Sequence, residues 1–216
     1  MEVLRVEELT VRRGKRKVLD GVTFSLRVGE KFIIAGDNGA GKTTLIETVM
    51  GFIPAEGGRI YLKGREVRNE EDFYALRTTV GYVFQNPDDQ LFSLTVEEEL
   101  AFAPLNLKLS REEVERRIDR ALKAFSIEHL REKTIHSLSG GEKRIVSIAC
   151  VLTMEPEALI LDEPTTGLDR KRFKRLVEFL KETDKSVIVV THDVELIKSL
   201  GWKVYRLENG KLFLLP

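Results

Sequence analysis

The stretch "GDNGAGKTTL" at residues 36–45 decides the fold. Residues 36 to 43 fit the pattern G-x-x-x-x-G-K-[ST], between the apolar run "KFIIA" and a helical pattern that begins at Lys42. A glycine-rich turn in this position exposes backbone N–H groups that can surround phosphates. Lys42 then reaches the β- and γ-phosphates of a nucleoside triphosphate, and the Thr43 hydroxyl can bind Mg²⁺. The stretch therefore predicts a nucleotide-binding loop in an α/β fold.

The segments around this loop have alternating strand and helix patterns. Period-two alternation predicts an antiparallel pair of strands over 2–13 and 18–30. Shorter apolar runs predict further strands at 31–36, 58–64, 80–85, 157–164 and 186–193. Helical spacing predicts helices at 42–52, 71–80, 95–107, 110–127 and about 170–182. Asn209-Gly210 between two apolar runs predicts a hairpin.

One stretch differs from the rest in character. From about 86 to 154 the chain is helical and rich in charge, and Ser110 with Glu113 has the pattern of a capping box. We therefore expect one domain over 1–216. Its α/β core comprises 1–85 and 155–216 and includes an antiparallel β subdomain, and an α-helical lobe is inserted over about 86–154.

The composition excludes several classes of function. Lys plus Arg is 35 and Asp plus Glu is 35, so the net charge gives no support to a general nucleic-acid-binding role. The single cysteine, Cys150, excludes an intrachain disulfide and fits a reducing compartment. The chain has no signal-peptide pattern and no apolar run as long as a membrane span. We expect a soluble protein, or one held at a membrane only by a partner.

A second stretch, "SLSGGEKR" at 137–144, has the pattern of a helix start that can hold an anion. Ser139 can N-cap the helix, and Glu142 three residues later completes a capping box. Gly140 and Gly141 leave the first backbone N–H groups uncovered, at a helix end that carries partial positive charge. The chain therefore has a second predicted phosphate site, but without a lysine of the usual kind.

Four further residues are weak signals by themselves. "LILDEP" ends an apolar strand with Asp162, which can hold Mg²⁺, and Glu163, a candidate general base for an attacking water. A strand that ends in Asp-Glu is often only a capped strand end. His192 follows the strand "VIVVT", and Gln85 follows "GYVF"; each alone is more often structural than functional.

Together these residues resemble one family, the nucleotide-binding subunits of ABC ATPases, which have a P-loop NTPase core. The order of motifs is Lys42, Gln85, "LSGGEKR" at 138–144, "LILDEPTTGLD" at 159–169, and His192. The resemblance covers nearly the whole chain, from about 3 to 214. The LSGG stretch is its most specific part, because other P-loop NTPases lack it.

The resemblance implies ATP and Mg²⁺ as cofactors and a head-to-tail dimer with a second ATPase subunit of the same or similar chain. The signature turn of one subunit would close over the nucleotide of the other, whose Lys42 supplies the missing lysine. Gln85 would contact Mg²⁺ and the attacking water, His192 would contact the γ-phosphate and orient Glu163, and Asp169 would lie at the dimer seam. The implied nucleotide-binding residues are Arg13, Gly36, Asp37, Asn38, Gly39, Ala40, Gly41, Lys42, Thr43, Thr44, Ser139, Gly140, Gly141 and Glu142, and the implied metal ligands are Thr43, Gln85 and Asp162.

The sequence departs from the family pattern at the adenine site. Family members usually place an aromatic residue just before the glycine of the first strand turn, where it stacks on adenine. Here "TVRRGKRK" offers Arg13, whose guanidinium plane can also stack on a base.

The stretch "GYVFQNPDDQLFSLTVEEELAFAP" at 81–104 narrows the resemblance. It is similar to the ATPases of energy-coupling factor and cobalt/nickel importers, which often carry a C-terminal extension that is not found here. The resemblance implies an ATPase that powers import of a small solute, of the metal-ion or vitamin class, as a peripheral subunit on the cytoplasmic face of the cell membrane. A transmembrane subunit would dock near Gln85–Phe92, where Leu91 and Phe92 are either a docking patch or buried core.

Two alternatives remain. The first is a non-transport ABC ATPase that acts on nucleic acid or ribosomes. Such proteins usually contain two fused domains or a long coiled coil, which this chain does not have, and the basic run "RRGKRK" is better explained as a solvated strand turn. We therefore expect no nucleic-acid partner. The second is a catalytically inactive regulatory subunit, and the filled catalytic positions argue against it.

Overall fold

The alternating residues at the N-terminus form the predicted antiparallel pair. In this computed structural model, which describes residues 1–215, β1 (Glu2–Arg13) pairs with β2 (Arg16–Arg27). β4 (Gly57–Leu62) adds to the other edge of β1, and β5 (Arg65–Glu66) follows, so the sheet has the order β2-β1-β4-β5. Inward-facing residues such as Leu4 and Val6 are fully buried. This sheet is the expected antiparallel β subdomain.

A second, mixed sheet carries the nucleotide-binding loop. Its strands are β3 (Lys31–Ala35), β6 (Val80–Val83), β7 (Ala158–Asp162), β8 (Ser186–Thr191), β9 (Lys203–Glu208) and β10 (Lys211–Leu214), in the order β10-β9-β3-β8-β7-β6. β3, β7, β8 and β9 are parallel, and β10 pairs antiparallel with β9 across the predicted Asn209-Gly210 turn. All residues of β7 and β8 are buried, as parallel strands covered on both faces require. The predicted α/β fold class is confirmed.

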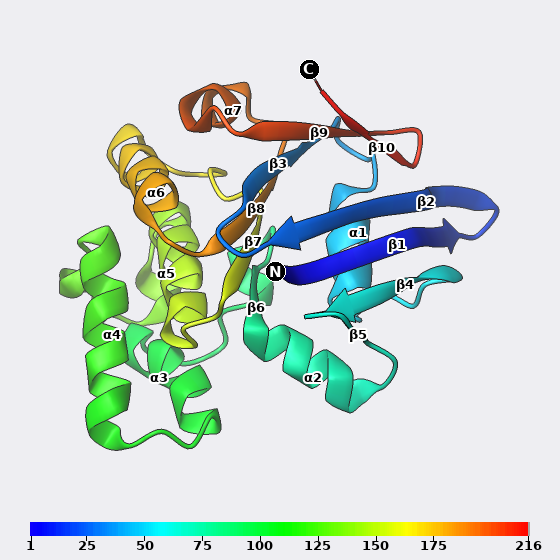
Figure 1. The fold of residues 1–216 in the computed structure, drawn as a ribbon. Helices are drawn as coiled ribbons and strands as arrows, with labels where there is room; N and C mark the ends of the chain where they lie inside the picture. Colours follow the sequence, from blue (N-terminus) through cyan, green and yellow to red (C-terminus); the bar gives the residue numbers. More distant parts are fainter. Residues whose placement is uncertain (216) are drawn as a thin grey trace. The chain divides into compact units, whose positions relative to one another are not determined.

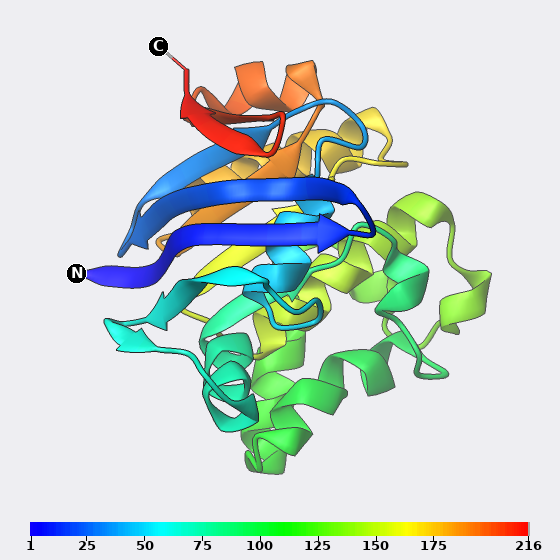
Figure 2. The same cartoon turned by 90° about the vertical axis from the view of Figure 1, so that its right-hand side faces the viewer.

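Three helices accompany these two sheets. They are α1 (Lys42–Val49), α2 (Glu70–Thr79) and α7 (Val194–Leu200), of which α7 was not predicted. Figures 1 and 2 show α1 lying between the antiparallel sheet and the mixed sheet. Leu45, Ile46 and Val49 of this helix are fully buried as a result. The nucleotide-binding loop is therefore held between a buried strand and a buried helix.

The helical segments form a second compact unit. It contains α3 (Val96–Asn106), α4 (Arg111–Phe125), α5 (Gly140–Thr153) and α6 (Arg170–Glu182), with short turns η1 (Pro87–Asp89), η2 (Glu128–Leu130) and η3 (Ile135–Ser137). α5 packs against both α3 and α4. α4 also contacts α6, where the rings of Phe125 and Phe179 lie 5.0 Å apart. α5 is therefore the central helix of this unit.

The contacts divide the chain at slightly different positions from those predicted. The first unit comprises Met1–Tyr82, Glu157–Glu163 and Asp184–Pro216, and the second comprises Val83–Pro156 and Pro164–Thr183. The expected boundaries at 85/86 and 154/155 lie close to two of these. The segment 164–183, with α6, belongs to the helical unit rather than to the core, and α6 packs against α4 of that unit.

One capping prediction is only half correct. The Ser110 hydroxyl caps α4 by accepting the backbone N–H of Glu113 at 3.3 Å. The Glu113 carboxylate does not return to Ser110, because it binds Arg116 at 2.5 Å and Arg117 at 2.7 Å. These two guanidinium groups lower the pKa of Glu113 to about 2. Side-chain pairing at i+3 and i+4 has therefore replaced the second half of the capping box.

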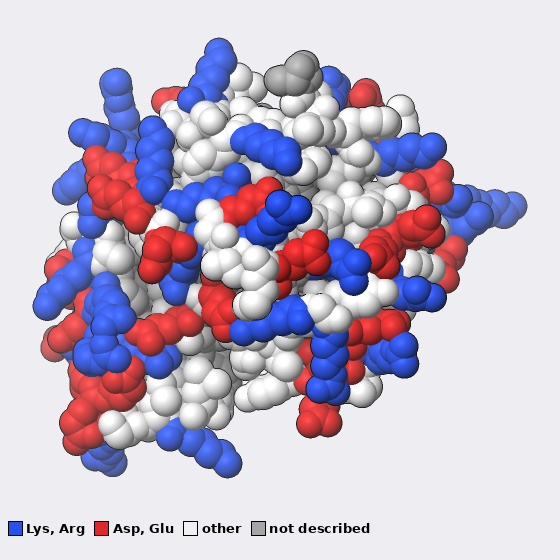
Figure 3. Space-filling view, in the orientation of Figure 1, with Lys and Arg blue, Asp and Glu red and all other residues white. Residues whose placement is uncertain are grey.

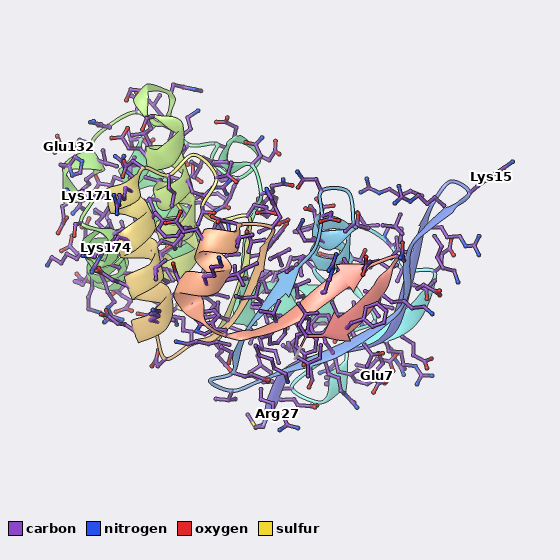
Figure 4. The ribbon with its side chains drawn as sticks, turned by 90° about the horizontal axis from the view of Figure 1, so that it is seen from above. Glu7, Lys15, Arg27, Glu132, Lys171 and Lys174 are labelled. Atoms are coloured by element: carbon purple, nitrogen blue, oxygen red, sulfur yellow. The ribbon has the colours of Figure 1, made fainter. Side chains whose placement is uncertain are left out.

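The surface carries both signs of charge. Figure 3 shows Lys and Arg interspersed with Asp and Glu over the visible face. The basic run at 12–17 is an exposed turn in which Arg12 pairs with Glu56 and Lys17 pairs with Asp20, and Lys15 points outward at the tip (Figure 4). Within residues 1–215, the helices are too short or too polar to span a bilayer.

The turn after α1 generates a stability prediction. Gly51 has a φ of 81°, and a Cβ there would lie 2.5 Å from the Phe73 ring, whereas Gly201 has a φ of 63° with open space around it. Gly201→Ala should destabilise the fold by about 1 kcal/mol through left-handed backbone strain alone. Gly51→Ala should cost about 2–4 kcal/mol, because overpacking adds to the same strain. Urea unfolding of both variants checks this, and equal losses would contradict the packing argument.

Candidate active site

The nucleotide-binding loop connects the end of β3 to the start of α1. Asp37, Asn38 and Gly39 are exposed, and Gly41 takes a left-handed conformation as the N-cap of α1. The first turn of α1 then presents backbone N–H groups that have no helical partner, so they are available to an anion. A cavity of about 410 Å³ borders the loop, lined by Arg16–Val18, Asp37–Ala40 and Arg206–Gly210. The structure thus presents the loop to an open, polar space.

Lys42 lies across this loop. Its side chain is 6% exposed, and its ammonium group donates to the carbonyl oxygens of Gly36 at 2.7 Å and Asp37 at 3.2 Å. The same nitrogen lies 3.4 Å from Oε1 of Glu163. A buried ammonium needs such partners, because an isolated charge is costly to remove from water. The lysine is therefore held in place beside the loop before any phosphate arrives.

Asp162 ends β7 with a buried carboxyl group. It is 0% exposed, and neither oxygen has a hydrogen-bond partner of good geometry among residues 1–215. Burial raises the pKa of Asp162 to about 6, the Thr43 hydroxyl opposes this, and the Glu163 charge adds to it. Two orphaned carboxylate oxygens near a threonine hydroxyl are hard donors of the kind that Mg²⁺ prefers. The residues present thus fit the expected cation.

Glu163 follows immediately and is held from three directions. It is 4% exposed and has an unusual positive φ of 46°. Its carboxylate accepts the Thr191 hydroxyl at 2.8 Å and the backbone N–H of His192 at 3.2 Å. Nδ1 of His192 lies 2.7 Å from Oε1, while more than half of the imidazole side chain is exposed. With the carboxylate ionised, Nδ1 carries the proton and Nε2 is left for a second ligand.

These residues come together because three parallel strands end side by side. β3 pairs with β8, which pairs with β7, so that Lys42, Thr191 and Glu163 meet beyond the carboxyl ends. Open α/β sheets bind ligands at this edge. Thr191 was not singled out from the sequence. The signal was available, since it is the last residue of a buried strand directly before His192.

The signature turn forms as the sequence predicts. Ser139 N-caps α5, and its hydroxyl accepts the backbone N–H of Glu142 at 3.3 Å. One Glu142 oxygen accepts both the backbone N–H and the hydroxyl of Ser139 at 2.8 Å. The Ser139 backbone bond is the main cause of the lowered pKa of Glu142, and Arg172 lies 3.3 Å from its other oxygen. Glu142 is therefore fixed as an ionised cap, with Gly140 exposed at the helix start.

Comparison with known proteins gives a direct match at the level of the family. Residues 19–166 match the model of the ABC transporter family. This range includes the phosphate loop, the signature turn and the Asp162-Glu163 pair. The chain belongs to the ABC transporter family.

This ABC ATPase is similar to energy-coupling factor proteins. It is 43% identical over 199 residues to the energy-coupling factor transporter ATP-binding protein EcfA of Methanocaldococcus jannaschii, a match that covers 90% of this chain and 71% of that protein. CbiO1 of Clostridium perfringens, described as part of the ABC transporter complex CbiONQ, superposes with a TM-score of 0.86 at 39% identity over 99% of this chain and 87% of its own. A dimeric ATP-binding cassette in a post-hydrolysis state, bound to ADP and phosphate, gives 0.86 at 26% identity over 97% and 96%. The predicted family membership and ATPase activity are confirmed.

Two residues with predicted roles at the nucleotide site, Arg13 and Gln85, make other contacts or belong to the other unit. Arg13 is exposed at the end of β1, and its guanidinium group approaches Glu47 of α1 at 3.9 Å. Arg13 does not line the cavity beside the loop, whereas Arg16 does. Gln85 belongs to the helical unit, where it is exposed. A stacking role for Arg13 and a metal-binding role for Gln85 stay predictions.

The geometry around Glu163 generates the first catalytic prediction. A carboxylate held by Thr191 and His192 at the end of β7 is placed to accept a proton from an attacking water. Glu163→Gln should keep ATP binding and reduce turnover by about 10²- to 10⁴-fold, because an amide does not act as a base. Lys42→Ala should instead lose nucleotide binding. Steady-state ATPase rates and equilibrium ATP binding separate the two effects, and near-normal turnover in Glu163→Gln would exclude Glu163 as the base.

Replacing Asp162 should increase the stability of the protein but weaken its function. Because its pKa in the folded protein is raised from 3.8 to about 6, ionisation at pH 7 opposes folding. This destabilisation decreases as pH falls through 6 and is gone below the unfolded pKa. Asp162→Asn should therefore stabilise the nucleotide-free protein by about 2 kcal/mol at pH 7, with a smaller gain at pH 5.

The same variant should weaken Mg²⁺-dependent ATP binding. Thermal unfolding at both pH values, together with ATP titrations with and without Mg²⁺, checks the pair of effects. The exposed Asp89→Asn is the control and should change neither. A pH-independent gain in stability for Asp162→Asn would show that folding does not raise the pKa of the Asp162 carboxyl.

Proposed function

We propose that this ABC ATPase powers import of a small solute, of the metal-ion or vitamin class, as the peripheral ATPase of an energy-coupling factor transporter on the cytoplasmic face of the membrane. The similarity to EcfA and CbiO1 over most of the chain supports this assignment. ATP is the energy source, and the cargo is selected by a membrane-embedded subunit that this chain contacts.

The catalytic part of the proposal assigns roles to the residues at the strand ends. Lys42 binds the β- and γ-phosphates, and Thr43 with Asp162 holds Mg²⁺, which neutralises the phosphate charge. Glu163 accepts the proton of the attacking water, and Thr191 with His192 keeps its carboxylate oriented. The orientation of Glu163 relies on contacts that the folded chain makes by itself.

The dimer part of the proposal uses the signature turn. A second ATPase subunit pairs head to tail, and its Ser139, Gly140 and Gly141 meet the γ-phosphate bound by Lys42 of the first. The dimeric cassettes among the structural relatives support this pairing. Glu142 is already neutralised by its capping bonds and by Arg172, so its charge opposes an incoming phosphate less than a free carboxylate would.

An exposed apolar patch on the helical unit carries the transport assignment. We define this patch by its four large side chains, each about half exposed or more: Phe92 at 66%, Leu94 at 63%, Phe102 at 48% and Leu105 at 55%. The rings of Phe92 and Phe102 meet edge to face with centroids 4.7 Å apart. Aromatic groups exposed side by side mark an interaction surface more often than a solvated one.

The loop that bears Phe92 is held from below by a buried carboxylate. Glu99 is 5% exposed and accepts the backbone N–H groups of Phe92 at 2.9 Å and Ser93 at 2.7 Å. Leu91 is 7% exposed and belongs to the core, so the expectation that it joins a docking patch is not met. Phe92 remains. A fixed loop with one residue inward and the next outward presents Phe92 at little entropic cost.

The proposed partner of the patch is an amphipathic helix of a transmembrane subunit with at least one arginine. Large apolar anchors suit the non-polar face of such a helix. The exposed carboxylates Asp88 and Asp89 precede Phe92 in the same loop, and they favour a guanidinium group on the incoming helix.

The alternative, a non-transport ABC ATPase that acts on nucleic acid or ribosomes, is less well supported. The net charge is zero, and the visible face mixes both signs of charge (Figure 3). The basic turn at 12–17 is partly neutralised by Glu56 and Asp20. Binding to phosphate backbones normally relies on a concentrated positive surface.

The docking assignment predicts that substitutions in this region weaken association with the membrane subunit without changing ATP hydrolysis. Phe92→Ala and Asp88→Ala should leave the ATPase rate of the isolated subunit largely unchanged, since neither residue is assigned to the nucleotide site. Loss of a central aromatic anchor should weaken assembly by about 2 kcal/mol, or about 30-fold. Phe213→Ala is the matched control, since Phe213 is 50% exposed on β10 of the other unit.

The measurement is co-purification from the native membrane. Tagged wild-type protein should retain an integral membrane protein after detergent extraction, the Phe92→Ala protein should lose it, and Phe213→Ala should retain it. Proteoliposomes made from the captured complex should then take up solute only with ATP. Capture of ribosomes or DNA without a membrane protein would overturn the transport function.

A further inference from the structure

A buried arginine joins the signature helix to the segment 84–90. Arg144 of α5 is 1% exposed and is the largest fully buried side chain of the described residues. One terminal nitrogen donates to the carbonyl oxygen of Phe84 at 2.7 Å, and the other donates to the carbonyl oxygen of Gln85. A guanidinium group that binds two adjacent carbonyls with its two terminal nitrogens fixes the main chain in direction as well as in distance.

A second contact closes the other end of the same segment. The side-chain oxygen of Gln90 accepts the backbone N–H of Phe84 at 3.1 Å, and its amide nitrogen donates to the carbonyl oxygen of Ser147 at 2.7 Å. Ser147 is on α5 and is fully buried. One amide side chain thus ties the start of the segment to its end and ties both to the helix.

A third contact is exposed. The Lys143 ammonium lies 2.6 Å from a carboxylate oxygen of Asp88, whose side chain is 63% exposed. Residues 143, 144 and 147 are within one turn of α5, so the three contacts come from one end of one helix. The same end begins with the signature turn at Ser139, where the capping box fixes the first turn.

These contacts have a mechanical consequence. The signature turn 139–142 is proposed to meet the ATP of the partner, and the segment 84–90 is proposed to lie at the membrane subunit. Both are connected by hydrogen bonds to the first half of α5, and together they form one short block. We propose that Arg144 is the positioning residue that makes the signature turn 139–142 and the segment 84–90 move as one body. The inference rests on the proposed function, since that function gives each surface its ligand.

The roles of the three contacts differ. The Lys143–Asp88 pair is exposed to solvent, where an ion pair contributes little, and a guanidinium from a docking helix can replace the ammonium at Asp88. The Arg144 contacts are buried and bind main-chain atoms, so side-chain exchange at the surface leaves them intact. Arg144 therefore carries the linkage, while Lys143 can release Asp88 to a partner.

The test uses the full chain and measures whether MgATP changes hydrogen exchange at both the signature turn and the segment 84–90. Hydrogen exchange is followed by mass spectrometry in Glu163→Gln, which is expected to retain ATP. MgATP should slow exchange in peptides that cover 139–150 and 84–92 together. Adding Arg144→Met should preserve the slowing at 139–150 and abolish it at 84–92. Arg116→Met and Lys143→Met, which remove exposed ion pairs, should keep both responses.

The outcomes are distinct. Retained slowing at 84–92 in the Arg144→Met protein would overturn the role of Arg144. Slowing at 139–150 alone in the parent would do the same while leaving the proposed dimer contact intact. No slowing at 139–150 in the parent would overturn that contact and this inference with it.

A conservative variant covers failure of Arg144→Met to fold. Arg144→Lys keeps the charge and offers one donor group without the fork, so it should reduce the response at 84–92 while the response at 139–150 persists. A Lys variant with both responses as in the parent would show that the guanidinium is not needed for the coupling.

Discussion

The first unit depends on one buried interaction, between the Lys42 ammonium and the Glu163 carboxylate at 3.4 Å. Both groups are almost completely buried, so each is tolerated only because the other is near and because further hydrogen bonds satisfy it. The sheet order explains how they meet. β8 lies between β3 and β7, and the parallel register ends the three strands at one edge, where the loop after β3 carries Lys42. Breaking this register would leave two buried charges unpaired.

The same arrangement prepares the site for a polyanion. Lys42 binds two main-chain carbonyls and one carboxylate. In the proposed function, a triphosphate replaces these contacts with stronger charge-assisted bonds. Glu163 loses only one of its partners in that exchange, because Thr191 and His192 still hold it. Asp162 behaves differently, since burial raises its pKa by more than the Thr43 hydroxyl and the Lys42 charge lower it. A cation at that position would compensate the buried charge of Asp162. Ligand binding would therefore stabilise the folded chain most at this position.

Motifs with local chemistry could be predicted from the sequence, and features set by packing could not. The loop around Lys42 and the Ser139–Glu142 capping box were predictable because each is specified within a few residues. The other capping prediction was only half correct, since arginines one turn further along α4 bind Glu113 more strongly than the helix start does. Thr191 was missed because its partner Glu163 is 28 residues away in sequence. The sequence left Leu91 open between a docking patch and the core, because the polarity of its neighbours does not show which way one side chain turns.

The segment 84–93 of the helical unit combines an exposed aromatic residue with a main chain fixed by buried polar side chains, and this is the strongest argument for a partner. An arginine of α5 and a glutamate of α3 are buried against this segment and bind its main-chain atoms, while Phe92 is exposed to solvent. Burying Arg144 and Glu99 is unfavourable unless the backbone geometry that they enforce is itself required. A loop that only connects β6 to α3 needs no such enforcement, because polar residues and flexibility serve it as well. Rigid backbone beneath exposed aromatic groups is instead the arrangement of a surface prepared for contact, in which the ordering precedes binding. The Lys143–Asp88 ion pair is exposed, so a cation of a docking partner can take the place of Lys143 at Asp88. The hydrogen bonds of Arg144 still connect the segment to the signature helix after this exchange.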